Sequence, residues 1–370
     1  MRPRTGLRRF LPELRPSPIG RVDVRRASVY AVAMAVVVAS CAAGPPAPSS
    51  SQTPSEAPSP AATSTALDQP PACLDAKLLW ADALDRLILA NCVDQFDVAS
   101  LETVWAWDGQ SWELLSDDGP PATVVTGFGW DPDRDVLVRY GGIPLPEQDC
   151  ITETWEWDMT EWRRVDAAPP EPCDHIELAW DATGEQMLLF GGGRGPDLMA
   201  GTWAWDGSEW SHLTDVGPAP RAHHGMAASF DGSAIVVYGG LDNSQLFDDR
   251  WAWNGLAWVD EGPTFDRLDP GPRSHHGLAR GPDGLVLFGG ATNSSTFESL
   301  VNDTWIEAES TGWALAANGG PRPSPRGLPA FGYDPGRDTF VLYGGFDADG
   351  NPLSDTWELD RTGWRCVNGC

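Results

Sequence analysis

Tryptophan pairs recur along this chain at intervals of about fifty residues. The steps between the first members of successive pairs are 50, 48, 48, 54 and 52 residues. A period of this size indicates a repeat architecture, in which no single unit buries its own apolar face. The repeat also explains a composition with 19 Trp but only 12 Phe and 5 Tyr. The six pairs are Trp105/Trp112, Trp155/Trp162, Trp203/Trp210, Trp251/Trp258, Trp305/Trp313 and Trp357/Trp364.

Each unit carries signals for four short strands. An apolar run ending in two glycines precedes the Trp pair in five units, at 139–142, 189–192, 237–240, 287–290 and 342–345, and the first unit has Asn91-Cys92 instead. Short apolar runs of this kind are typical of strands buried on both faces. A further position before a turn recurs in every unit, and we assign to it Trp80, Trp130, Trp180, Phe230, Pro282 and Tyr333.

The Trp pairs flank a turn that predicts a hairpin. In the fourth unit, the sequence RWAW at 250–253 runs into Asn254-Gly255, a strong signal for a two-residue hairpin loop. Such a loop would make Trp251 and Trp258 cross-strand partners, and likewise Trp203/Trp210 and Trp105/Trp112. Because side chains alternate along a strand, Trp253 shares the face of Trp251. We therefore expect an apolar slab of three indoles in each hairpin.

Six such units, stacked radially, would bury their slabs against one another. The paired Gly, the Thr-Trp pairs and the period near fifty resemble the kelch repeat, and more distantly the central domain of galactose oxidase. The resemblance implies an all-β, six-bladed β-propeller of kelch type over residues 73–370, with four antiparallel strands per blade. The sequence departs from this pattern at Asn91-Cys92, at Arg250 in place of Thr, and at Glu307 and Leu359 in place of the second aromatic residue.

The N-terminal segment has the features of an export signal. Arg25 and Arg26 precede an apolar run over 29–38, too short to span a bilayer comfortably. The sequence Val-Ala-Ser-Cys at 38–41 resembles a bacterial lipobox, which implies cleavage before Cys41 and its lipidation. Residues 1–41 are thus predicted to be a lipoprotein signal peptide, and 42–72, rich in Pro, Ser, Ala and Thr, a disordered tether. We expect a propeller on the outer face of the bacterial cell membrane, anchored by lipid only.

The remaining cysteines form an even set, which suggests disulfides in an exported protein. Cys150 and Cys173 lie in neighbouring loops and are expected to pair. Cys73, Cys92, Cys366 and Cys370 lie at the two ends of the repeat array. They either pair locally or staple one end to the other, and we hypothesise that an end-to-end bridge closes the ring.

Five of the six His stand at the start of the first strand in three consecutive units, near arginines. They would lie on one face of the disc, as a candidate binding face of His175, His223, His224, His275, His276, Arg221, Arg273 and Arg326. The competing interpretation is that they are recurring frame elements that satisfy backbone groups. We assign no metal site; Asp347 and Asp349 resemble half of a calcium loop, but the downstream Glu is missing, so a structural turn is favoured over calcium binding.

Charge and motifs narrow the function. Acidic residues number 53 against 25 basic ones, for a net charge of −28, which argues against nucleic-acid binding. No catalytic motif is recognisable. We therefore favour a monomeric binding scaffold for a protein or carbohydrate of the cell envelope. The alternative is an exported enzyme, such as a sugar epimerase, lyase or oxidase, with its site near the propeller axis. A cluster of Arg, His and carboxylates in the axial pocket would favour the enzyme. An axial channel that lacks such groups or is filled by side chains would favour the scaffold.

Overall fold

The computed structural model describes residues 69–73, 75–92, 102–144, 149–262, 269–293, 299–308, 312–316 and 319–370. The predicted signal peptide, Cys41 and most of the predicted tether lie outside these residues. Among the described residues, no helix is long and apolar enough to cross a bilayer.

The described residues form six four-stranded antiparallel sheets, each built from one continuous stretch of chain. We number these blades one to six along the sequence. Blade one contains β1 (Lys77–Ala81), β2 (Arg86–Ala90), β3 (Val104–Trp107) and β4 (Trp112–Ser116). Blade two contains β6 (Gly127–Asp131), β7 (Val136–Tyr140), β9 (Thr154–Trp157) and β10 (Trp162–Val165). Blade three contains β11 (Glu177–Asp181), β12 (Gln186–Phe190), β15 (Thr202–Trp205) and β16 (Trp210–Thr214).

The second half of the chain continues the pattern. Blade four contains β17 (Gly225–Ala228), β18 (Ile235–Tyr238), β19 (Arg250–Trp253) and β20 (Trp258–Asp260). Blade five contains β21 (Gly277–Gly281), β22 (Gly284–Ala291), β23 (Leu300–Ala308) and β24 (Gly312–Leu315). Blade six contains β25 (Ala330–Asp334), β26 (Thr339–Tyr343), β27 (Thr356–Asp360) and β28 (Gly363–Asn368). Two small strand pairs and one 3₁₀ turn complete the described elements: β5 (Thr123–Val124) with β8 (Ile143–Pro144), β13 (Gly193–Arg194) with β14 (Asp197–Leu198), and η1 (Asp82–Leu84).

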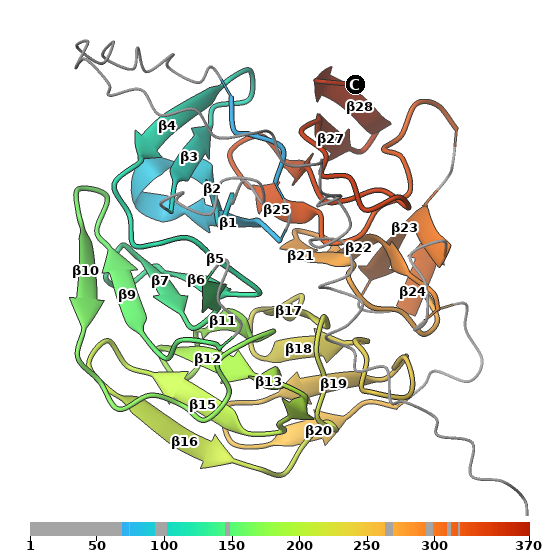
Figure 1. Cartoon of the computed structure of the whole chain (residues 1–370). Helices are drawn as coiled ribbons and strands as arrows, with labels where there is room; N and C mark the ends of the chain where they lie inside the picture. Colours follow the sequence, from blue (N-terminus) through green and yellow to red (C-terminus); the bar gives the residue numbers. More distant parts are fainter. Residues whose placement is uncertain are drawn as a thin grey trace, which may run out of the picture.

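The blades stand around a central axis (Figure 1). The first strand of each blade lies innermost and packs against the first strand of the next, and β25 of blade six packs against β1 of blade one. The ring is therefore closed, and the predicted six-bladed all-β propeller is confirmed.

The hairpins of the Trp pairs have a different register from the predicted one. Trp205 pairs with Trp210, Trp107 with Trp112 and Trp253 with Trp258, whereas Trp203 faces His212. The loop has four residues rather than two, because the Asp206 carboxylate accepts hydrogen bonds from the backbone N–H of Ser208 and Glu209 at 2.8 and 2.9 Å. This turn, centred on the Asp side chain, is an alternative to the two-residue loop.

The Trp side chains join neighbouring blades through their indole N–H groups. Trp210 of blade three donates to Thr154 of blade two at 2.9 Å, and Trp258 of blade four donates to Thr202 at 2.8 Å. The Thr of the Thr-Trp pair is thus the acceptor for the following blade. Blade four has Arg250 at this position, and its guanidinium instead contacts Glu307 of blade five at 3.0 Å. Arg250 and Glu307, which both depart from the repeat pattern, therefore replace the Trp–Thr hydrogen bond with an ion pair between blades four and five.

The ring closes without a covalent bridge between its ends. The disulfides are Cys73–Cys92, Cys150–Cys173 and Cys366–Cys370. The second is the pair we expected, but the end-to-end staple is wrong, since the cysteines of each end pair locally. Closure is noncovalent: β1 packs against β25, Trp112 of blade one donates to Thr356 of blade six at 3.1 Å, and residues 69–73 add further contacts with blade six. The Tyr343 hydroxyl donates to the carbonyls of Pro70 and Pro71 at 2.7 and 3.0 Å, and the backbone N–H of Cys73 donates to Leu353 O at 3.3 Å.

Tyr343→Phe is expected to loosen this closure. Removing one buried hydrogen bond lowers the free energy of unfolding by about 1 kcal/mol. The matched control is Tyr140→Phe, since Tyr140 makes the equivalent bond to Pro170 O at 3.0 Å within the ring. Both variants should lose similar stability, but only Tyr343→Phe should raise the hydrogen exchange of the Ala72 and Cys73 amides. Equal exchange there in both variants would contradict closure through Tyr343.

Candidate functional site

Equivalent residues of the six inner strands form rings around the axis. One such ring lies near the end of the inner strands. Each of its residues pairs with a residue at the start of the second strand of its blade, as Trp80 pairs with Leu87 and Arg280 with Leu285. Its members are Trp80, Trp130, Trp180, Ala228, Arg280 and Tyr333. The sequence prediction placed Phe230 and Pro282 here, which is wrong, because both lie two residues further on, in the turns.

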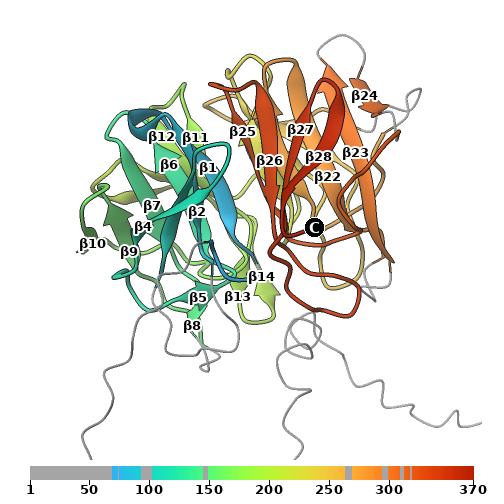
Figure 2. The ribbon, with the colours of Figure 1, turned by 90° about the horizontal axis from the view of Figure 1, so that it is seen from above.

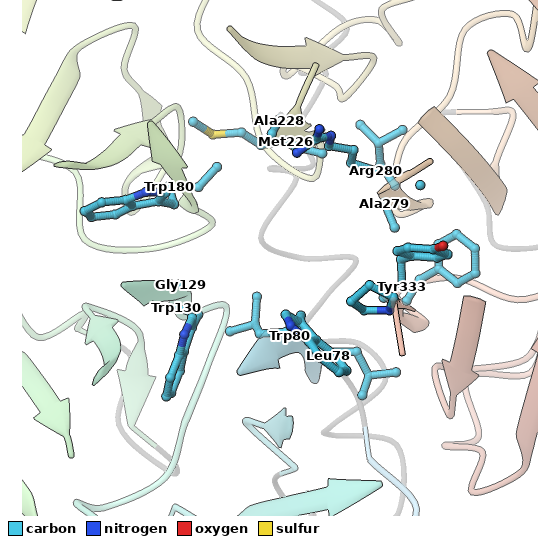
Figure 3. A pocket seen from close by; sticks show the side chains of 18 of the residues that line it. Leu78, Trp80, Gly129, Trp130, Trp180, Met226, Ala228, Ala279, Arg280 and Tyr333 are labelled. Atoms are coloured by element: carbon cyan, nitrogen blue, oxygen red, sulfur yellow. The ribbon is translucent and has the colours of Figure 1, made fainter. Parts of the chain in front are cut away.

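This ring surrounds the mouth of an axial cavity of about 480 Å³. Figure 3 shows Trp80, Trp130, Trp180, Arg280 and Tyr333 arranged around the opening. Small or apolar residues form the rest of the wall, among them Ala179, Ala227, Ala279, Leu178, Met226, Leu278 and Phe331. The repeat pattern identified the Trp at this position but did not single out Arg280. Arg280 could have been found from the turn of the inner hairpin in blade five, which is two residues shorter than the equivalent turn in the other blades and shifts the recurring position from Pro282 to Arg280.

Most polar groups at the mouth are held by local partners. The Trp80 indole donates to Asp82 at 3.0 Å, and the Tyr333 hydroxyl donates to Asp338 at 2.7 Å. Partial burial, together with Asp338, raises the pKa of Tyr333 to about 12, so this hydroxyl stays protonated. Nε and Nη2 of Arg280 donate to the carbonyl of Phe230 at 3.2 and 3.1 Å. The indole N–H of Trp130 has no partner among the described residues, although this side chain is only 6% exposed.

Charged groups lie nearer the opposite end of the axis. Lys77 of blade one and Glu177 of blade three form an ion pair of 2.7 Å between two inner strands. Burial opposes charging of Lys77, but the carboxylates of Glu177 and Asp75 outweigh it and raise the pKa of this ammonium above its ordinary value. The pair links blades that are not neighbours in sequence order, so it braces the ring across its axis.

Three of the candidate histidines belong to another ring, just before the inner strands. The backbone there is left-handed in every blade, with φ of 57, 54, 55, 52, 59 and 47° at Asp75, Val125, His175, His223, His275 and Leu328. The N–H of His275 donates to His223 O at 3.0 Å, and that of Leu328 to His275 O at 2.7 Å. The rings of His223 and His275 stack at 3.8 Å, and His175 meets His223 edge-on at 4.6 Å.

The other two histidines point into the blade joints. His224 and His276 are 3% and 7% exposed, and their rings pack edge-on against Phe190 and Tyr238. They pack against the paired glycines: a Cβ on Gly191, where φ is +73°, would lie 2.6 Å from the His224 ring. The glycine pairs of the repeat thus leave room for the neighbouring blade as well as for the turn.

The three candidate arginines are buried. Each residue is no more than 1% exposed, and its guanidinium pairs with both oxygens of an Asp two residues before a Trp. Each also donates to the carbonyl of the first glycine of its pair, as Arg221 does to Gly239 O at 2.8 Å. The pairs are Arg221–Asp249, Arg273–Asp303 and Arg326–Asp355. The structure places these arginines, with His224 and His276, inside the frame rather than on a surface that contacts solvent.

The candidate metal ligands adopt structural roles. The Asp347 carboxylate accepts hydrogen bonds from the N–H groups of Asp349 and Asn351 at 2.9 Å, which makes a tight turn. Within the described part of the chain, one group of three potential metal-ligating atoms lies close together: Cys150, Cys173 and Asp174. Its two sulfurs are bonded to each other.

Six radial blades around an axial cavity define a β-propeller. The model of the KLHDC2/KLHL20/DRC7 Kelch-repeats domain matches residues 134–306, just under half of the chain, so this stretch is similar to kelch repeats. The chain is also similar to a solved structure titled "Structure of YjhT", with 12% identity, a TM-score of 0.61 and coverage of 81% of this chain and 99% of that one. At this identity the likeness concerns the fold. No curated protein matches significantly. Since 411 chains of solved structures match significantly, the fold alone selects no function.

Proposed function

We propose that this protein is an envelope-tethered scaffold that binds a protein or glycan ligand at the axial mouth. The observation that carries the proposal is the composition of the cavity. Among its described lining residues, Arg280 and Tyr333 are the titratable ones, and neither His nor carboxylate occurs. General acid–base catalysis usually depends on such groups within reach of the ligand, whereas an apolar wall with a few polar groups is typical of a binding pocket.

The point at which residues 69–73 meet the ring supports this role. Residues 69–73 meet the ring beside Asp75, whereas the mouth is formed at the other end of β1, by Trp80. Figure 2 shows β5, β8, β13 and β14 together at one end of the ring, and β13 pairs with Asp174, beside the histidine ring. A lipid on Cys41 and a tether over 42–68 would therefore attach to the end opposite the mouth. The mouth would face away from the membrane, where envelope ligands can reach it.

An exported enzyme is the second candidate. The observation that favours it is the axial set of Asp75, Lys77 and Glu177 near His175 and His223. These groups lie beyond the lining of the axial cavity, so a substrate in the mouth would not contact them without rearrangement. The scaffold therefore remains the better-supported role.

Retention of envelope components separates the two candidates. Immobilised full-length protein is incubated with a solubilised envelope extract and compared with Trp180→Ala and with Trp203→Ala, a partly exposed Trp of the same blade outside the cavity. We expect a component that is retained by the wild type and by Trp203→Ala, lost from Trp180→Ala, and eluted with unchanged mass. Equal retention by all three proteins would refute binding at the mouth, and elution of a chemically altered component would favour the enzyme.

A further inference from the structure

We propose that the axial mouth binds an uncharged carbohydrate, with one pyranose ring held against the faces of its indoles. This inference rests on the binding role proposed above and specifies its ligand. It is carried by three features of the mouth: unstacked aromatic faces, an unpaired buried donor and the distribution of charge.

The indole faces of Trp80 and Trp180, which are only partly buried, are available to a ligand at the mouth. Among the described residues, the rings of Trp80, Trp130, Trp180 and Tyr333 make no contact with one another, although all four surround one opening (Figure 3). Many Trp of the outer hairpins pack against another aromatic ring, as Trp205 does with Trp210 at 5.3 Å. Open indole faces offer large apolar areas, and the C–H faces of a pyranose ring match them in size and polarity. The volume of about 480 Å³ lies in the range of small-molecule sites.

The unpaired indole N–H of Trp130 favours a ligand that carries a hydrogen-bond acceptor. A buried N–H without a partner is rare in folded proteins and costs about 1–3 kcal/mol. The Trp130 indole N–H is such a donor, and its side chain lines the cavity. Nη1 of Arg280 is a second donor at the mouth, since Nε and Nη2 are the nitrogens that bond to Phe230 O. Hydroxyl oxygens of a sugar can accept from both, whereas a hydrocarbon ligand cannot.

The charges at the mouth select against ions of either sign. Arg280 lines the cavity and repels a cation, which argues against a quaternary ammonium in an aromatic cage. Asp82 and Asp338 hold the rim side chains of Trp80 and Tyr333, and the chain carries a net charge of −28, which disfavours a polyanion. An uncharged ligand with many hydroxyl groups satisfies both conditions.

Binding of defined probes tests the inference. Full-length protein in detergent is titrated with cellotriose, maltotriose and triacetylchitotriose, and with choline and trigalacturonate as charged controls. Saturation-transfer NMR and Trp fluorescence report binding. We expect at least one neutral trisaccharide to bind. Trp180→Ala should weaken it by at least about tenfold, Trp130→Phe by about five- to tenfold through loss of the N–H, and Trp203→Ala should leave it unchanged.

The outcomes separate this inference from the role on which it rests. If no neutral trisaccharide binds, or if Trp180→Ala binds as well as the wild type, the carbohydrate inference is overturned. Binding of choline or trigalacturonate that is lost in Trp180→Ala would overturn it as well, but would leave a binding role for the mouth. The proposed function fails only when envelope components, too, are retained independently of Trp180.

Discussion

Arg326→Met is expected to destabilise the propeller by about 3–5 kcal/mol, the range measured when one partner of a buried ion pair is removed. Arg326 is fully buried and contacts both oxygens of Asp355 at 2.6 and 2.7 Å. Burial opposes ionisation of Asp355, but Arg326 outweighs it and holds the pKa of this carboxyl below its ordinary value. Met preserves most of the volume but removes the cation that neutralises Asp355, which keeps the Trp357 indole N–H as a side-chain donor, and it leaves the Gly344 carbonyl without its Arg326 donor.

The comparison with a surface ion pair makes this prediction specific. Arg361 is 72% exposed and contacts Asp283 and Asp338, so solvent screens these ion pairs and Arg361→Met should cost much less stability than Arg326→Met. Urea unfolding at pH 7 measures both. The double variant Arg326→Met/Asp355→Leu should recover part of the loss, because it removes the uncompensated charge. A cost for Arg326→Met as small as that for Arg361→Met would show that the repeated Arg–Asp pairs do not hold the frame.

The sequence was sufficient for the blades because their determinants are local and repeated. The Trp period fixes the number of units, and the paired glycines mark where the second strand of a blade ends, as at Gly191 after β12. The hairpin register failed for an equally local reason. Asp-Gly indicates a two-residue turn, but the Asp206 side chain closes a longer one by binding two backbone N–H groups. The turn preference of the Asp-Gly dipeptide does not take into account the hydrogen bonds that the Asp carboxylate accepts.

The candidate site could not be derived in the same way. Trp180 and Trp205 are the same residue type in the same blade, yet one lines the axial cavity and the other is buried in a joint, where it donates to Glu156. Trp180 lies on the innermost strand of its blade and Trp205 on the third strand outward. The spacing of Trp along the sequence does not show which strand lies nearest the axis. The arginines near the candidate histidines were compatible with a binding face or with a role in the frame. Their charges are neutralised by ion pairs such as Arg273–Asp303, whose partners lie thirty residues apart in the sequence.

Lowering the pH from 7 to 5 is expected to destabilise the protein through its buried histidines. Burial lowers the pKa of His223, His224 and His276 well below the ordinary value, and lowers that of His275 to about 3. The folded state therefore keeps these rings neutral while the unfolded chain protonates them near pH 6.5. Below that pH the unfolded state binds more protons, so stability falls as the pH falls, by about 1.4 kcal/mol per pH unit for each such group.

Protonation of Glu102 changes the free energy of unfolding in the opposite direction to protonation of the histidines. Burial raises the pKa of its carboxyl to about 7, despite Arg139 at 3.9 Å, so the folded state takes up a proton before the unfolded state does. This contribution stabilises the fold as the pH falls from 7 towards 4.5, and it offsets about one histidine. Burial also raises the pKa of Asp75, Glu177 and Glu307, and these carboxyls act in the same direction as Glu102. The contribution of the histidines is therefore isolated by substitution of a single ring.

His224→Leu tests the contribution of a single ring. Both ring nitrogens of His224 lack partners among the described residues, so an apolar side chain of similar size can replace the ring without breaking a hydrogen bond. The free energy of unfolding in urea, measured between pH 7 and pH 5, should fall less steeply than in the wild type, by about one proton. His212→Leu, at an exposed site beside Asp215, should retain the full slope. If His224→Leu retained that slope as well, the buried ring would not contribute to acid sensitivity, and the loss of stability would have to arise from other groups.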